Sequence, residues 1–168
     1  MQNKPPRLLL ILGILTIINT GIASLSGFAG ILTGPPSLEQ IKNQDIEMAK
    51  LSKVLIQYKT SPEVLDLVQK FQFLTKALNE NYILFTSVST LISLSGLISI
   101  MLMFKRNMYG FHLYIIYCLM SSTSMYLIVS PEDIPTAVLL VNLIISCFFI
   151  FLYSKNINWL KFDTSIKE

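Results

Sequence analysis

The chain of 168 residues is apolar, and its few charges are unevenly distributed. Hydrophobic residues make up 52% of it and charged residues only 14%, whereas an ordinary soluble domain carries about 25% charged residues. The net charge of +3 is too small to indicate nucleic acid as a partner. Both cysteines lie inside apolar runs, so they cannot form a disulfide that staples an extramembrane domain. The composition therefore indicates a membrane protein.

Four stretches of the sequence contain no Asp, Glu, Lys or Arg. Each is at least as long as the roughly 20 residues that a helix needs to cross a bilayer. The charge-free stretches are 8–38, 81–104, 107–131 and 134–154. They predict an all-α membrane protein, one domain over 1–168, with four transmembrane helices at about 8–32, 82–104, 111–129 and 135–153.

The first apolar run also has features of a secretory signal peptide. Lys4 and Arg7 precede it, and 23-ASLSG-27 offers small residues at a possible cleavage site. The uncharged run nevertheless continues through residue 32, which is longer than a usual signal-peptide core. We therefore expect an uncleaved first helix.

Basic residues are concentrated in three short flanking segments. They predict a cytoplasmic location for the two termini and for the connection between the second and third helices. The connection 130-SPEDIP-135 carries only acidic charges, and the long segment 33–81 balances six lysines with six acids, so both are expected outside the cytoplasm. The basic residues that we take as topology and headgroup anchors are Lys4, Arg7, Lys105, Arg106, Lys155 and Lys161.

The segment 36–80 is predicted to be an extracytoplasmic amphipathic helical hairpin that stands on the outer face. Pro35-Pro36 ends the first helix, and Ser37 with Gln40 forms a capping box for a helix of about 38–59. Ser61 and Pro62 begin a second helix. Nothing between residues 78 and 82 clearly stops it, so one helix over about 62–104 is an open alternative. The apolar stripes pack on each other or, alternatively, on a partner or the lipid headgroups.

Small and hydroxyl residues recur in the spans at alternating spacings of three and four, which is typical of close helix contacts in membranes. The series are Thr16, Thr20, Ala23, Gly27, Gly30; Thr86, Ser89, Ser93, Gly96; and Tyr114, Tyr117, Ser121, Ser124; the fourth span offers Asn142 and Ser146.

One polar residue from each span lies about midway through the bilayer. These four residues, Asn19, Ser93, Ser121 and Asn142, form a candidate midplane polar layer. It has two interpretations: hydrogen bonds between helices, worth about 0.6 to 2 kcal/mol each, or a site for a solute or ion, as in transporters.

The sequence gives no sign of catalysis, of a metal or of another cofactor. The spans contain none of the charged residues that mark proton relays. His112 is the only histidine, and the CxxC, HExxH and GxSxG patterns do not occur. We therefore expect a protein that is not an enzyme and has no cofactor.

The short basic tail, 154–168, is expected to be cytoplasmic. Trp159 lies in it among Leu160 and Phe162, between Lys155 and Lys161. This mixture of aromatic, apolar and basic residues predicts a tail that lies on the inner membrane surface, with Trp159 as a further anchor.

Two stretches carry a resemblance to a family. In 104-FKRNMYGFHLY-114 an apolar span ends in Lys-Arg before a short turn, and 8-LLLILGILTII-18 opens the first span. The layout resembles the uncharacterised small four-helix inner-membrane proteins typical of Bacteroidota. The resemblance implies the inner membrane of a Gram-negative bacterium and carries over no functional residues.

The sequence thus predicts a non-catalytic multi-pass membrane protein. The expected role is that of an accessory, scaffold or assembly subunit, in contact with the bilayer and with other membrane subunits or its own copies. One alternative is a small oligomeric transporter or channel for a small solute or lipid that uses the midplane layer. The other is a membrane sensor.

Overall fold

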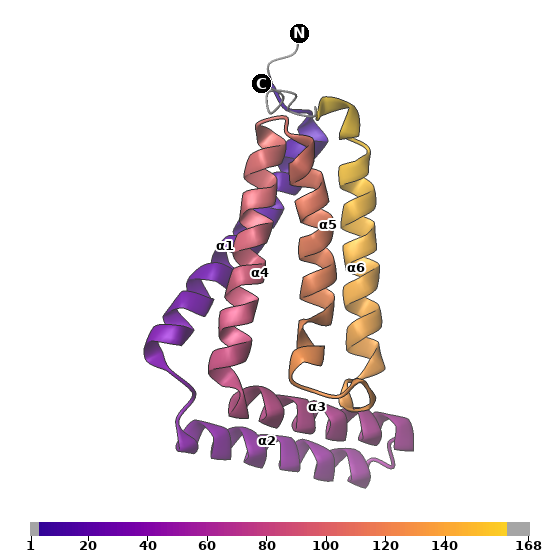
Figure 1. Ribbon diagram of the computed structural model, residues 1–168. Coiled ribbons are helices and arrows are strands. Elements are labelled where there is room, and N and C mark those ends of the chain that lie inside the picture. Colours follow the sequence, from indigo (N-terminus) through magenta and orange to yellow (C-terminus); the bar gives the residue numbers. More distant parts are fainter. Residues whose placement is uncertain (1–3, 161–168) are drawn as a thin grey trace.

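The computed structural model describes residues 4–160, which form helices and turns, with no strand in that range. Four helices run side by side in an elongated bundle, and two more lie across one end of it (Figure 1). The bundle helices are α1 (Arg7–Thr33), α4 (Tyr82–Phe104), α5 (Met108–Thr123) and α6 (Thr136–Ser154); the helices across the end are α2 (Leu38–Gln57) and α3 (Pro62–Glu80). The all-α prediction is confirmed.

Three of the bundle helices are long and apolar enough to cross a membrane. They are α1, α4 and α6, and they coincide within a residue or two with the predicted spans at 8–32, 82–104 and 135–153. Their length and composition are those of transmembrane helices and indicate a membrane protein.

The helix at the third predicted span is shorter than expected. The α-helix α5 ends at Thr123 rather than near 129, and a 3-10 turn, η1 (Ser124–Leu127), follows it. The hydroxyls of Ser122, Thr123 and Ser124 each donate a hydrogen bond to a carbonyl three or four residues earlier. Such bonds compete with regular helical geometry, and a run of Ser and Thr has low helix propensity. The prediction of a continuous helix over 111–129 is therefore wrong at its C-terminal end.

The segment between α1 and α4 is a helical hairpin, as predicted. Ser37 caps α2 in a complete capping box, because its hydroxyl accepts from the Gln40 amide at 3.2 Å and its own amide donates to Gln40 Oε1 at 2.8 Å. Pro62 is the first residue of α3. Side-chain hydrogen bonds from Gln72 to Ser52 (3.2 Å) and from Asn79 to Gln44 (3.3 Å) join the two helices.

The hairpin lies across the end of the bundle instead of standing away from it. The chain changes direction between α3 and α4 (Figure 1), at Asn81, whose φ of −108° and ψ of 29° are not helical. The Asn81 side chain donates to the Ala77 carbonyl at 3.0 Å, a local bond that competes with helix continuation. The alternative of one helix over 62–104 is therefore wrong.

Small residues mark the closest helix contacts, as the spacing pattern predicted. A Cβ added to Gly27 would collide with the Thr90 hydroxyl, and one added to Gly96 would come within 2.9 Å of Thr20 Cγ2. Gly110 brings α5 against the backbone of α4 in the same way. The bundle is thus packed most tightly along α1, α4 and α5.

Two apolar clusters hold the ends of the bundle. The larger lies between the helix ends remote from the hairpin and includes the fully buried Leu9, Ile100, Met103 and Tyr153. The smaller joins the hairpin to the α5–α6 connection, which contains the 3-10 turn η2 (Pro131–Asp133). Its buried members are Leu74, Val129 and Ile134.

Candidate functional site

The helices α1, α5 and α6 leave a cavity of about 310 Å³ between them. At the end of the cavity remote from the hairpin, α1 and α6 are joined, because the Tyr153 hydroxyl lies 2.8 Å from Thr16 Oγ1 in a buried hydrogen bond. Beyond that contact the helices separate. The cavity is lined by Leu15, Thr16, Asn19, Tyr114, Tyr117, Cys118, Ser121, Ser122, Asn142, Ile145, Ser146 and Phe149.

The cavity is uncharged, offers neutral hydrogen-bonding groups on a largely apolar lining, and is open at the side of the bundle. Its lining combines two carboxamides with hydroxyl groups, one thiol and apolar side chains, and includes no Asp, Glu, Lys, Arg or His. Asn19 and Ser121 are exposed, and Asn142 is half-buried. A site of this kind can donate and accept hydrogen bonds, but it has no group that carries charge into the membrane.

Three of the four residues of the predicted midplane layer meet at this cavity. Asn19 comes from α1, Ser121 from α5 and Asn142 from α6. Ser93 does not join them, because it is buried on α4 with 7% of its surface exposed and does not line the cavity. The layer is therefore divided between an open site and a packed helix contact.

Hydrogen bonds within the cavity leave one carboxamide unpaired. Ser122 and Ser146 face each other across α5 and α6 with 3.4 Å between their hydroxyl oxygens, and the Asn19 side chain faces the Tyr117 hydroxyl. Within residues 4–160 the Asn142 side chain has no hydrogen-bond partner. In hydrocarbon such an amide is costly unless it finds a partner.

Sequence reasoning missed several of the lining residues. Thr16, Tyr114 and Tyr117 had been identified only as members of contact stripes, and Cys118 only as an apolar-run cysteine. The stripe Tyr114, Tyr117, Ser121 does line the cavity, so its periodicity carried the signal. The sequence did not indicate which neighbouring helix would leave the stripe uncovered, and the cavity could therefore not be predicted.

The predicted anchors lie at the end of the bundle remote from the hairpin, where the start of α1, the α4–α5 turn and the end of α6 come together (Figure 1). Lys4, Arg7 and Lys105 are exposed there. Lys155 places its Nζ 4.8 Å from the centroid of the Phe151 ring. Lys161 lies outside the described residues. A role of these residues as headgroup anchors stays a prediction.

Arg106 and Trp159 bind each other. The Arg106 guanidinium carbon lies 4.3 Å from the centroid of the Trp159 ring, and its Nε donates to the Trp159 carbonyl at 3.5 Å. Arg106 adopts a left-handed backbone with a φ of 66°, and Trp159 is half-buried in the 3-10 turn η3 (Ile157–Trp159). The pair thus ties the end of α6 to the α4–α5 turn.

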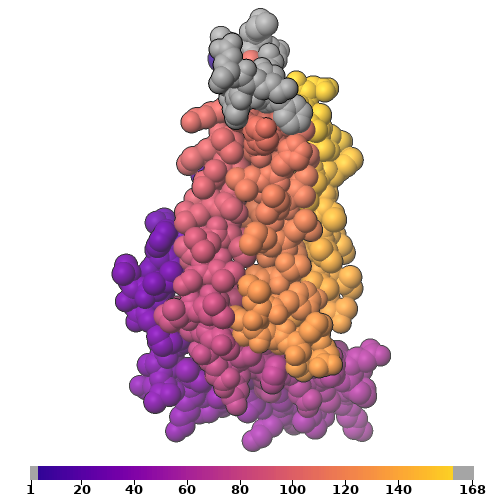
Figure 2. Space-filling view, viewed as in Figure 1, coloured from indigo at the N-terminus to yellow at the C-terminus, as the bar shows by residue number. Residues whose placement is uncertain are grey.

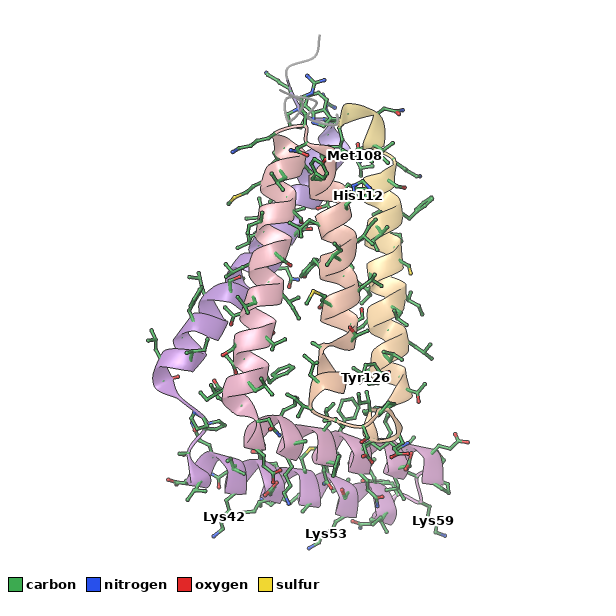
Figure 3. All side chains as sticks on the ribbon, in the orientation of Figure 1. Lys42, Lys53, Lys59, Met108, His112 and Tyr126 are labelled. Atoms are coloured by element: carbon green, nitrogen blue, oxygen red, sulfur yellow. The ribbon has the colours of Figure 1, made fainter. Side chains whose placement is uncertain are left out.

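The remaining chemistry-bearing residues form no second site. Among residues 4–160 no group of three or more His, Cys, Asp or Glu could hold a metal ion. His112 is exposed on α5, and its Nδ1 lies 3.0 Å from the Met108 carbonyl (Figure 3). Cys118 is buried and Cys147 is exposed, and both are free thiols.

No family model, curated protein or solved structure matches the chain. What the protein does must therefore be argued from its own geometry, in which the open polar cavity between α1, α5 and α6 is the most distinctive feature.

Proposed function

We propose that this protein is a non-catalytic accessory or assembly subunit of the bacterial inner membrane, and that it binds a transmembrane helix of a larger complex at the seam between α1 and α6. The observation that carries the proposal is the lateral cavity lined by Asn19, Ser121 and Asn142. It leaves neutral hydrogen-bonding groups uncovered on the side of a membrane bundle.

The proposal includes a fourth span and a defined orientation. The helix α5 together with η1 extends over 20 residues, Met108 to Leu127, which is enough for a crossing. Lys4, Arg7 and Lys105 are exposed at one end of the bundle. Glu132 and Asp133 lie in the connection at the other end, where the six lysines of the segment 33–81 are balanced by six acids. The positive-inside rule then supports cytoplasmic termini and a hairpin outside the cytoplasm.

A partner helix fits the seam better than an empty cavity does. Lipid tails cannot hydrogen-bond to the unpaired Asn142 amide, whereas a helix with Ser, Thr, Asn or Gln at mid-depth can satisfy it. Each contact of this kind is worth about 0.6 to 2 kcal/mol. Because helix association in lipid has no hydrophobic driving force between apolar surfaces, such bonds also select the partner.

The experiment is co-purification of the intact protein from its native membrane in a mild detergent, with quantification of the chains that accompany it. We expect a stoichiometric partner with the natural sequence and its loss with the double variant Asn19→Leu, Asn142→Leu. The matched control is Thr123→Leu, since Thr123 is exposed on α5 and does not line the cavity.

Monodispersity in size-exclusion chromatography separates loss of the partner from loss of folding. If the folded double variant retains the same partner as the natural sequence, the seam is not the binding site and the proposal is wrong.

The size of the cavity favours a second candidate function, that of a small carrier. About 310 Å³ falls at the lower end of the range for small-ligand pockets, so the same residues could bind a small neutral solute or a lipid group in an oligomeric carrier. In that case the protein purifies without other chains, and reconstituted vesicles release a neutral solute in a manner that Asn142→Leu abolishes.

A further inference from the structure

The helix α3 carries one apolar stripe along its whole length. Val64, Leu67, Phe71, Leu74 and Leu78 follow one another at spacings of three and four residues, so they lie on one face of the helix. The stripe therefore faces one side of α3 along the whole helix.

The C-terminal half of this stripe is covered by protein more completely than the N-terminal half. Leu74 is 5% exposed and packs with Leu78 against Val129 and Ile134 in the α5–α6 connection. In the N-terminal half Val64 remains 38% exposed and Phe71 37% exposed. Because Leu74 on this face touches the end of the bundle, Val64 and Phe71 point toward the same side, where the protein covers them only in part.

We infer that the partly exposed N-terminal half of the stripe, Val64, Leu67 and Phe71, rests on the bilayer surface, so that α3 is an interfacial membrane-contacting helix. The placement follows from the path of the chain. Only Asn81 separates α3 from α4, and α4 is long and apolar enough to cross the membrane. A helix that lies across the end of a membrane span is held in the plane of the headgroups.

The charges of the hairpin agree with this placement. Lys42, Lys53 and Lys59 point away from the bundle (Figure 3), toward water rather than toward the membrane. Tyr82 stands at the junction of α3 and α4, a depth at which aromatic side chains are enriched. The N-terminal end of α3 also projects past the bundle (Figure 2), so it reaches beyond the protein onto lipid.

The contact is apolar rather than ionic. An amphipathic helix that buries Val, Leu and Phe at the boundary between headgroups and acyl chains gains from the apolar area removed from water. The stripe itself contains no charged residue, and Lys70 of α3 is paired with Asp66 at 3.4 Å, so we expect the contact not to depend on anionic lipid or on low salt. Zwitterionic phosphatidylcholine is therefore a sufficient partner.

The test places a tryptophan on each side of α3 in the full-length protein in phosphatidylcholine nanodiscs. Phe71→Trp reports on the stripe. Phe73→Trp is the matched control, because Phe73 is 50% exposed and a step of two residues turns about 200° around the helix. The native Trp159 contributes the same background to both variants, and circular dichroism verifies folding.

We expect the emission of Phe71→Trp to shift to the blue and to be quenched by lipids brominated near the headgroup, at low and high salt alike. Emission of Phe73→Trp should instead be quenched by aqueous iodide. Equal iodide quenching of the two variants would place the stripe in water and overturn the inference.

Shielding of Phe71→Trp from both quenchers would place a protein partner on the stripe and would equally overturn it. The inference rests on α4 crossing the bilayer and not on the partner at the α1–α6 seam, so either proposal can fail without the other.

Discussion

The helices α1, α4 and α5 are packed together along their lengths, whereas α6 is attached mainly at its two ends. At the end of α6 remote from the hairpin the buried Tyr153 reaches Thr16, and just before the start of α6 Ile134 packs against Leu74 of the hairpin. Between these ends α6 borders the cavity, and six of its large apolar side chains, Leu140, Val141, Ile144, Ile145, Phe148 and Phe151, are exposed.

The difference follows from the distribution of glycine. Gly27 and Gly30 of α1 and Gly96 of α4 let side chains of the opposite helix reach the backbone, and Gly110 does the same for α5. The sequence of α6 contains no glycine. Without glycine a membrane helix approaches its neighbour less closely, and packing is the main force available to it. An open seam is the result.

The largest expected effect is that of Gly110→Ala, which disrupts the close contact between α5 and α4. The new Cβ would lie 2.6 Å from the Met103 backbone nitrogen and 2.6 Å from the Ser99 carbonyl oxygen. Because backbone atoms cannot move aside, we expect a loss of about 3 kcal/mol of stability. Thermal unfolding in detergent measures it.

The control for that variant is Gly21→Ala, since nothing lies within 4 Å of a Cβ at Gly21. Equal unfolding temperatures for the two variants would contradict the account of close packing between α4 and α5.

The next effect concerns the contact between the hairpin and the connection that precedes α6. Leu74→Ala removes the centre of the cluster with Val129 and Ile134, and we expect a loss of about 2 kcal/mol. Hydrogen exchange of residues 125–135 should accelerate, since these residues lose their cover. Leu38→Ala is the control because Leu38 is 86% exposed. Unchanged exchange in the Leu74 variant would show that the hairpin does not hold the connection.

A smaller effect is expected at the contact between α1 and α6, where Tyr153 reaches Thr16. Tyr153→Phe keeps the ring against Tyr114, 4.5 Å between centroids, but removes the hydrogen bond to Thr16. The expected loss is about 1 kcal/mol. A double-mutant cycle with Thr16→Val isolates the bond. Additive losses would mean that the two side chains do not interact in the membrane.

The smallest effect concerns the pair formed by Arg106 and Trp159, which reinforces the same attachment. Arg106→Ala loses a cation–π contact of about 0.5 to 1 kcal/mol and keeps the left-handed backbone. Arg106→Gly loses the same contact but relieves strain of about 1 kcal/mol. We therefore expect the glycine variant to unfold at a higher temperature than the alanine variant. The opposite order would argue against strain at this turn.

Much of the fold could be predicted because its signals are local. Charge-free runs locate α1, α4 and α6, and the capping box at Ser37 and Gln40 locates the start of α2. Pro62 locates the start of α3. Each of these depends on residues within one or two helical turns. The similar depths of Asn19, Ser121 and Asn142 also predict that they meet wherever their helices face one another. Depth alone does not decide this, since Ser93 has the same predicted depth and does not line the cavity.

The rest depends on contacts between distant segments. The local preferences that end α5 at Thr123 and turn the chain at Asn81 are weak. We infer that the packing of Leu74 against Ile134, from distant parts of the chain, adds to them. Ser93 is buried because α4 is central, whereas Asn19 is exposed because α6 stays away from α1.

The sequence by itself thus determined which segments become apolar helices, because helix formation and membrane insertion depend on the residues of one segment. Only the tertiary structure decided which of their polar faces remain uncovered, because coverage depends on how closely two backbones can approach. For this protein the absence of glycine from α6 is the physical reason that the seam beside Asn142 is open.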